Sequence, residues 1–186
     1  SDVITPRPRT PGGPRGNAFK SSMVVIMNRG GFGMSMSELL ERLEAAGIIL
    51  DDLTKSAMID IKPGDFTDYD LEGFWHDRPV PFLFTGFGAT RTISAPHMIA
   101  TLLYHLEVIV GQDIILVGSK GGYLAAIIDR MVGEDGSVTI IEPNEEVRLH
   151  TQDRLSSHRC SGEIKVIRPN DVDEICLLYT SPSPRD

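Results

Sequence analysis

Between residues 35 and 60, apolar and polar positions recur with the period of helices. Ser35 and Glu38 have the spacing of a capping box, and a one-sided apolar pattern follows them until Gly47. A second helix is predicted from 53 to 59, because a pair of aspartates stands before it and Pro63 follows it. Two short amphipathic helices are therefore expected before residue 63.

The stretch from Phe66 to Phe84 contains aromatic residues but shows no helical period. Pro79 and Pro81 exclude a helix there, so we expect an ordered loop. The glycine-rich residues 85–90 that follow are typical of the turn of a β-hairpin.

The second half of the chain combines apolar runs with further helical patterns. Ser94 precedes Pro96 and an apolar helical face that continues to Leu106, so Ser94 occupies the expected N-cap position. The continuous apolar run 114–117 predicts a strand that is buried on both faces of a parallel sheet. The glycine-rich residues 118–122 follow this strand and lead into another helical pattern.

Two more strands complete the pattern. Residues 138–141 and 164–167 are the predicted strands, and Asn144 is the expected cap of the helix between them. Strand, glycine turn, helix, strand, helix and strand in this order are typical of the mononucleotide-binding half of a doubly wound sheet. We therefore expect an α/β fold with a Rossmann-like sheet, of which the chain holds the first half to two-thirds. A fourth strand is considered for residues 173–179.

Composition divides the chain into four parts. Residues 1–33 are rich in proline and glycine without an apolar face, which predicts a disordered leader. Residues 34–90 form the expected N-terminal helical and loop subdomain, and residues 91–179 form the partial nucleotide-binding domain. Residues 180–186 contain two closely spaced prolines and are expected to be a disordered tail.

Charge, cysteines and histidines narrow the classes of protein. The net charge is −8, and because the first 29 residues carry +4, the remainder carries −12, which argues against a nucleic-acid partner. Cys160 and Cys176 have neither metal-site nor disulfide-scaffold spacing, which indicates a reducing compartment. The apolar run 23–27 is too short for a signal peptide or a membrane span, and the histidines lack paired metal-ligand spacing. We expect a cytoplasmic protein with no metal, membrane or nucleic-acid partner.

The glycine turn has the chemistry of a cofactor loop. A strand that turns through glycines into a helix presents backbone N–H groups to a ligand without a side chain in the way. Glu142 ends the next strand 20 residues after Gly122, where an acidic residue usually accepts hydrogen bonds from ribose hydroxyls. Together they indicate a cofactor that contains adenosine. Lys120 lacks P-loop spacing and is interpreted as a solvent-facing loop lysine or a contact to a cofactor carboxylate.

Residues 92–98, Thr-Ile-Ser-Ala-Pro-His-Met, carry the most specific signal in the chain. With the apolar helix, the Val-Gly-Ser-x-x-Gly-Tyr loop and the strand ending in Glu142, they resemble the protein-L-isoaspartate O-methyltransferase family. Asp77 opens an Asp-x-Pro-Val-Pro segment that is also similar to this family, and the resemblance extends from about Leu39 to Ile167.

The resemblance implies an enzyme on a Rossmann-like methyltransferase sheet. Such an enzyme transfers a methyl group from S-adenosylmethionine to the α-carboxylate of isoaspartyl residues in damaged proteins or peptides, which begins their repair. The resemblance also implies roles for nine residues. These are Ser94 as the active-site serine, Asp77 and His97 near the substrate, and Thr92, Ile93, Gly118, Ser119, Gly122 and Glu142 at the cofactor.

The chemistry agrees with a site that has no catalytic triad. A carboxyl group with a pKa of about 4 is ionised at neutral pH, so its attack on a sulfonium methyl needs no strong base. Positioning and partial removal of water are what the residues must supply.

The chain departs from the family pattern in the glycine loop. Leu116 stands where an acidic residue is usual, and Lys120 stands where a glycine is usual. Two other classes of protein therefore stay open. One is a non-catalytic nucleotide- or peptide-binding relative, or an inactive fragment, in which these changes mark lost cofactor use. The other is a nicotinamide-dependent oxidoreductase half-domain, which only the glycine turn and Glu142 favour.

Overall fold

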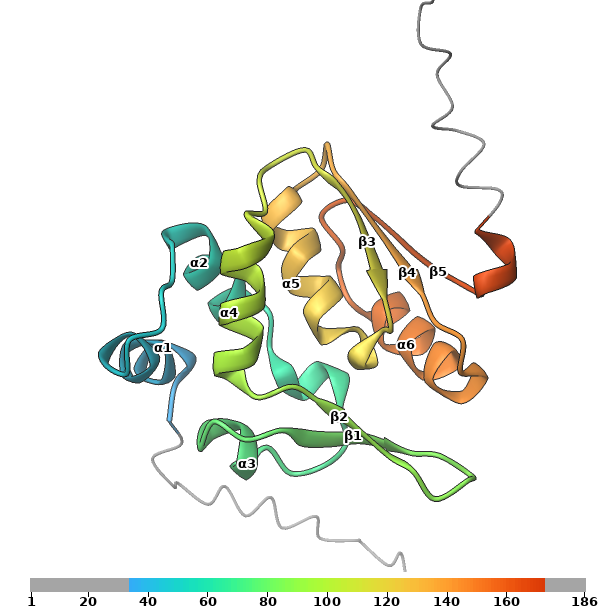
Figure 1. The fold of residues 1–186 in the computed structure, drawn as a ribbon, viewed down its shortest axis with the longest axis horizontal. Coiled ribbons are helices and arrows are strands. Elements are labelled where there is room, and N and C mark those ends of the chain that lie inside the picture. Colours follow the sequence, from blue (N-terminus) through green and yellow to red (C-terminus); the bar gives the residue numbers. More distant parts are fainter. Residues whose placement is uncertain (1–33, 173–186) are drawn as a thin grey trace, which may run out of the picture. The chain divides into compact units, whose positions relative to one another are not determined.

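The computed structural model describes residues 34–172, and their N-terminal part is helical (Figure 1). The predicted capping box is present, with Ser35 Oγ accepting from the Glu38 amide at 3.2 Å and the Glu38 carboxylate accepting from the Ser35 amide at 2.7 Å. Asp51 caps the second helix by accepting a hydrogen bond from the Thr54 amide at 2.7 Å. The elements are α1 (Met36–Ala45), α2 (Asp52–Asp60), the 3-10 turn η1 (Pro63–Phe66) and α3 (Glu72–Trp75).

An antiparallel hairpin follows, made of β1 (Val80–Phe84) and β2 (Thr90–Ile93). The hairpin turn is confirmed, but the expectation of a loop without helix from Phe66 to Phe84 is wrong for α3 and for β1. Proline has no N–H for a strand ladder, yet it is tolerated at edges and bulges. Pro81 lies where the register shifts, and its carbonyl accepts a hydrogen bond from Thr67 Oγ1 at 2.7 Å. Tertiary contacts therefore place a strand where composition favours a loop.

Helix α4 (Pro96–Leu106) begins one position later than predicted. Ala95, not Ser94, is the N-cap, because Pro96 occupies the first helical position and keeps the residue before it extended. Alanine has no side-chain acceptor, so the missing hydrogen bond comes from elsewhere. Asp77 Oδ1 accepts from the His97 amide at 2.9 Å, across 20 residues of sequence.

Three parallel strands form the second sheet, in the order β3-β4-β5. Asn144 caps α6 by accepting from the Val147 amide at 3.0 Å, as predicted. The elements are β3 (Asp113–Val117), η2 (Lys120–Gly122), α5 (Tyr123–Val132), β4 (Ser137–Ile141), α6 (Glu145–Ser157), β5 (Glu163–Ile167) and η3 (Pro169–Asp171). The α/β fold with a Rossmann-like sheet is confirmed.

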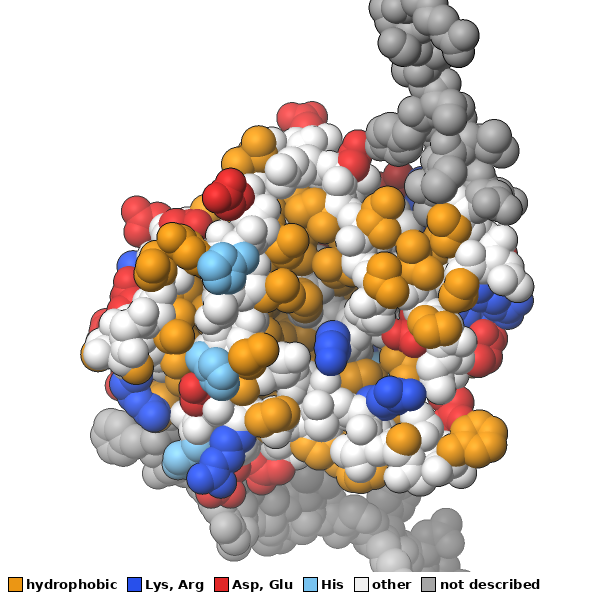
Figure 2. All heavy atoms as spheres, in the orientation of Figure 1, with side chains coloured by type: hydrophobic (Ala, Val, Ile, Leu, Met, Phe, Trp, Pro, Cys, Tyr) orange, Lys and Arg blue, Asp and Glu red, His pale blue; other side chains and the backbone are white. Residues whose placement is uncertain are grey.

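One face of this sheet carries the core. Leu116, Ile140 and Val166 lie in register and pack in the same hydrophobic cluster as residues of α5 and α6. On the opposite face Ile115 is 57% exposed and Val117 is 81% exposed. The prediction that β3 is buried on both faces is wrong for the described residues, because α5 and α6 contribute to the core on one face only. Figure 2 shows hydrophobic side chains gathered on the surface formed by β3 and α4.

The helices before the hairpin share this core. The Tyr123 ring lies against the rings of Phe66 and Phe74, with centroid separations of 5.6 and 5.8 Å. The buried cluster includes Leu39 of α1, Met58 of α2, Phe82 of β1, Leu103 of α4 and Ile128 of α5. The segments before and after residue 90 therefore stabilise one another through the same packing.

Several expectations lie outside the described residues. They are the leader 1–33, the fourth strand considered for 173–179, the tail 180–186 and Cys176. Cys160 is described and is a free cysteine. Among residues 34–172, no helix combines the length and the apolar character that crossing a bilayer requires.

Candidate functional site

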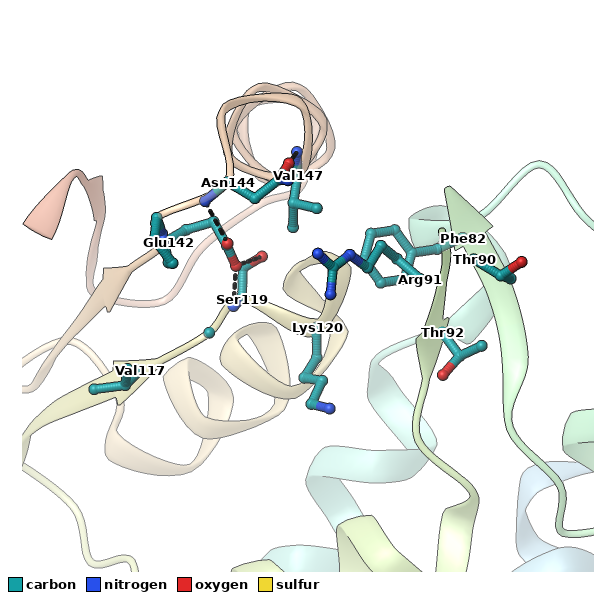
Figure 3. A pocket seen from close by; sticks show the side chains of 12 residues that line it. Phe82, Thr90, Arg91, Thr92, Val117, Ser119, Lys120, Glu142, Asn144 and Val147 are labelled. Atoms are coloured by element: carbon teal, nitrogen blue, oxygen red, sulfur yellow. Dashed lines mark hydrogen bonds between the residues drawn. The ribbon is translucent and has the colours of Figure 1, made fainter. Parts of the chain in front are cut away.

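A pocket of about 430 Å³ lies between the carboxyl ends of β3 and β4 and the hairpin (Figure 3). Residues 117–120, residues 142–144 and Val147 line it on the side of the sheet. Phe82 and residues 90–92 line it on the side of the hairpin. Ligands of open α/β sheets bind beyond the carboxyl ends of the strands, so this pocket is the expected place for a cofactor.

Two glycines of the loop have different tasks. Both need a left-handed backbone, with a φ of +88° at Gly118 and +74° at Gly121. A Cβ added to Gly118 would meet no atom within 4 Å, and Gly118 lines the pocket, so its bare backbone is open to a ligand. A Cβ added to Gly121 would lie 2.8 Å from Cγ of Phe82. Gly121 therefore serves the packing of the loop against the hairpin.

Gly122 belongs to the interior. A Cβ added there would lie 3.3 Å from Leu155 Cγ, and Gly122 does not line the pocket. Several loop amides are also already engaged within the protein. The Gly118 amide donates to the Ile141 carbonyl at 2.9 Å, and the Gly122 amide donates to the Ser119 carbonyl at 2.9 Å. Fewer N–H groups are thus offered to a ligand than a glycine loop of this kind suggests.

Glu142 orders the glycine loop through hydrogen bonds with Ser119. Its Oε2 accepts from the Ser119 amide at 2.8 Å and from Ser119 Oγ at 3.0 Å, and its Oε1 accepts from the Asn144 amide at 2.9 Å. Glu142 is 7% exposed and Ser119 is 1% exposed. A carboxylate has about four acceptor positions, so roughly one is left for a ligand hydroxyl. Glu142 both orders the loop and keeps a limited capacity for a ribose.

Thr151 extends this network and was not singled out from the sequence. Its Oγ1 donates to Ser119 Oγ at 2.8 Å, so that a buried relay runs from Thr151 through Ser119 to Glu142. The sequence contains a weak signal for it. Thr151 lies four residues after Val147 and four before Leu155, both of them buried, so a hydroxyl interrupts the apolar stripe of α6.

The pocket carries positive charge at Arg91 of the hairpin and at Lys120 of the glycine loop. Arg91 and Lys120 are exposed, and neither has a carboxylate partner within residues 34–172. Figure 3 shows the Arg91 side chain extending from β2 toward the glycine loop. The buried acid Glu142 and these two cations suit a ligand that carries hydroxyls and a carboxylate.

A second pocket of about 240 Å³ adjoins the loop on the side of α4. Its lining is mostly apolar and includes Ile93, Met98, Leu102 and Leu124. Ser94 and Lys120 also line it, and Lys120 is the charged residue common to both pockets. The Ser94 hydroxyl makes no hydrogen bond to another described residue. Ser94 is thus free to bind a ligand that enters beside the glycine loop.

The predicted site residues divide between the two pockets. Thr92, Gly118, Ser119 and Glu142 line the first pocket, whereas Ile93 and Ser94 line the second. Of the other three predicted residues, Gly122 lines neither pocket, and Asp77 and His97 bind each other, since His97 Nδ1 lies 2.9 Å from Asp77 Oδ2. Asp77 and His97 line neither pocket and hold the start of α4, and their contact with a substrate stays a prediction.

Burial also perturbs groups near the site. Desolvation lowers the pKa of His150, whose ring stacks near Phe82 with centroids 5.1 Å apart and contacts the Phe66 carbonyl at 3.3 Å. Full burial raises the pKa of Tyr123 far above its ordinary value. Within residues 34–172, no group of three or more His, Cys, Asp or Glu side chains is placed to hold a metal ion.

Comparisons with known proteins found relatives that share one name. A curated protein-L-isoaspartate O-methyltransferase from Methanopyrus kandleri is 30% identical over 137 residues, which are 73% of this chain and 58% of that protein. The protein of the same name from Pyrobaculum islandicum is 32% identical over 130 residues, which are 69% and 60% of the two chains. The chain thus spans little more than half the length of these relatives.

A solved structure named protein-L-isoaspartate O-methyltransferase has the same fold. It matches with a TM-score of 0.59 and 22% identity, over 72% of this chain and 41% of that one. The family model of protein-L-isoaspartate (D-aspartate) O-methyltransferase matches residues 34–171, which is most of the sequence. The chain belongs to the protein-L-isoaspartate (D-aspartate) O-methyltransferase family.

Proposed function

We propose that this chain takes part in methyl transfer from S-adenosylmethionine to the α-carboxylate of isoaspartyl residues in damaged proteins or peptides. The observation that carries the proposal is the meeting of two pockets at the glycine loop. One contains Glu142 and the open backbone of Gly118, and the other contains the Ser94 hydroxyl, which has no hydrogen-bond partner among the described residues. Such adjacency is what a reaction between two bound molecules needs.

The first pocket fits S-adenosylmethionine, which supplies an electrophilic methyl group on a sulfonium. Glu142 has acceptor capacity left for a ribose hydroxyl, and the left-handed Gly118 allows close approach of the ligand. Val117, 81% exposed at the pocket edge, offers apolar surface for an adenine ring. Arg91 is a free cation for the carboxylate of the methionine part.

The second pocket orients the methyl acceptor and keeps water away from it. An isoaspartyl α-carboxylate is already ionised near neutral pH, so no residue has to remove a proton from it. Ser94 donates a hydrogen bond that holds the attacking oxygen in line, and Ile93, Met98 and Leu102 keep water from it. Because Ser94 is not used as a helix cap, its hydroxyl is available for this task.

The first experiment measures the cofactor and the reaction separately. S-adenosylhomocysteine is titrated calorimetrically into the 186-residue chain, and methyl transfer to an isoaspartyl peptide is followed with labelled S-adenosylmethionine. Loss of a hydrogen bond to a charged group at Ser94→Ala is expected to lower kcat/KM roughly 10- to 100-fold. Ser37→Ala, at an exposed position of α1, is the matched control and should leave it unchanged.

The outcomes separate the competing functions. Binding of S-adenosylhomocysteine without methyl transfer would favour a non-catalytic relative or an inactive fragment. Binding of NADH in its place would favour the oxidoreductase alternative. Full activity of Ser94→Ala would remove the role assigned to Ser94. Isoaspartyl-containing proteins as partners and a cytoplasmic location belong to the same proposal, the latter supported by the absence of disulfide or metal spacing at the two cysteines.

A further inference from the structure

Lys120 has an unusual backbone for its residue type. Its φ is +47°, in the left-handed region that residues with a side chain rarely adopt. Its neighbours with positive φ in the loop, Gly118, Gly121 and Gly122, meet the same requirement without a Cβ. A strained residue that persists in a ligand-binding loop points to a function of its side chain.

The position of Lys120 indicates what its side chain does. It lines the second pocket together with the Ser94 hydroxyl, and it is the charged residue in a lining that is otherwise mostly apolar. It has no carboxylate partner within residues 34–172. Figure 3 shows its side chain directed away from Ser119 and Glu142. An exposed ammonium beside an apolar pocket is placed to pair with an anionic group that binds there.

We propose that the ammonium group of Lys120 binds the carboxylate of the methyl acceptor beside Ser94, an inference that rests on the proposed function. A carboxylate that enters this pocket loses part of its hydration, and the ammonium compensates for that loss. The cofactor pocket has its own cation in Arg91, whereas the second pocket has Lys120. Lys120 therefore makes the site select an acid over a neutral acceptor.

The reaction indicates which kinetic constant Lys120 governs. A carboxylate oxygen forms a bond to the methyl carbon, the carbon–sulfur bond breaks, and its electron pair stays on sulfur. Lys120 keeps its proton throughout. Because the acceptor loses its negative charge as the ester forms, the ammonium stabilises the bound acceptor more than the transition state. Lys120 thus lowers KM for the acceptor and does not raise kcat.

The test pairs a change in the protein with a change in the ligand. An isoaspartyl peptide and its α-carboxamide counterpart are bound to the full chain in the presence of S-adenosylhomocysteine, and affinities are measured by fluorescence anisotropy. The wild-type chain should prefer the acid roughly 10-fold or more, Lys120→Met should bind both equally, and Lys120→Arg should keep the preference. Lys62→Met, at an exposed lysine before η1, should behave as wild type.

The second part of the experiment tests whether Lys120 binds the carboxylate of the cofactor instead of that of the acceptor, because Lys120 also lines the first pocket. Binding of S-adenosylhomocysteine is compared with that of its decarboxylated analogue in the same variants. A Lys120→Met effect confined to this comparison overturns the acceptor assignment, and so does a peptide preference that survives in Lys120→Met. Urea unfolding of each variant accompanies the binding data, and Lys120→Gly is expected to be at least as stable as wild type.

The inference and the proposed function fail in distinguishable ways. An acid preference that depends on Lys120, in a chain that transfers no methyl group, supports the role of Lys120 and overturns the proposed reaction. Methyl transfer by a Lys120→Met variant that still prefers the acid supports the reaction and overturns the role of Lys120.

Discussion

The two walls of the first pocket are built differently. On the wall of the sheet, Ser119 and Glu142 are almost fully buried, and a relay from Thr151 satisfies the Ser119 hydroxyl. On the wall of the hairpin, Thr90 and Arg91 are exposed, and no hydrogen bond from their side chains to another described residue is present.

Because of this difference, the two walls contribute to ligand binding in different ways. A wall that is already ordered loses little conformational entropy when a ligand binds, which favours affinity. A wall with the exposed cation Arg91 adapts to the charged part of the ligand after it arrives. We expect changes in the wall of the sheet to affect stability and binding together, and changes in the wall of the hairpin to affect binding alone.

The largest effect is expected for Glu142→Ala. This change leaves the buried amide and hydroxyl of Ser119 without their acceptor, and each unpaired buried donor costs about 1 to 3 kcal/mol. The free energy of unfolding in urea should therefore fall by about 3 kcal/mol. Arg91→Ala, on the other wall, should change it by less than about 0.5 kcal/mol. Equal losses in the two variants would contradict the distinction between the walls.

Gly121→Ala should have the next largest effect. The new methyl group would lie 2.8 Å from the Phe82 ring, at a left-handed φ, so stability should fall by about 2 kcal/mol. Gly118→Ala is the matched variant, because it has the same type of φ but open space around the Cβ. Gly118→Ala should lose only about 1 kcal/mol of stability but weaken S-adenosylhomocysteine binding in calorimetry. Similar stability losses in both would argue against the packing role of Gly121.

Asp77→Ala tests the hydrogen bond by which Asp77 caps the first turn of α4. It removes the acceptor for the His97 amide, and loss of such a cap costs about 1 kcal/mol. Asp77→Asn keeps a side-chain oxygen and tolerates the φ of +58°, so it should lose less. Circular dichroism during thermal unfolding measures both variants, and an Asn variant weaker than the Ala variant would exclude capping as the role of Asp77.

The smallest effect concerns pH and His150 of α6, whose ring lies against the Phe82 ring. Burial lowers its pKa in the folded chain, so the unfolded chain binds more protons once the pH falls below the ordinary value of about 6.5. Its contribution to stability is intact above that pH and is lost as the pH falls toward the lowered pKa. His150→Gln should therefore flatten the decline in stability between about pH 7 and pH 5. A slope that stays the same in His150→Gln would contradict this assignment.

Local signals predicted much of the fold. Ser35, Asp51 and Asn144 each cap a helix within three residues of themselves, so the sequence around them contains the whole interaction. The three parallel strands were also predicted, because continuous apolar runs bounded by glycines and polar residues are a local pattern.

Contacts between distant residues account for the places where the structure differs from the predictions made from the sequence. The start of α4 depends on Asp77, and the strand at Pro81 depends on Thr67, so neither is encoded near the affected residue. The exposure of Val117 depends on which helices cover the sheet. In the site, Gly118, Ser119 and Glu142 line one pocket, and their contact with a cofactor stays a prediction, whereas the relay from Thr151 spans 32 residues and has only a weak signal in the spacing of α6.

The cap of α4 also bears on the order in which the chain folds. Helices α1, α2 and α6 carry their own caps and have what they need to start before any long-range contact forms. The first turn of α4 lacks such a cap, because its acceptor lies 20 residues upstream, on the far side of the hairpin. The hairpin must close before Asp77 reaches the helix. We therefore expect the segment that presents Ser94 to be among the last parts of the described chain to become ordered.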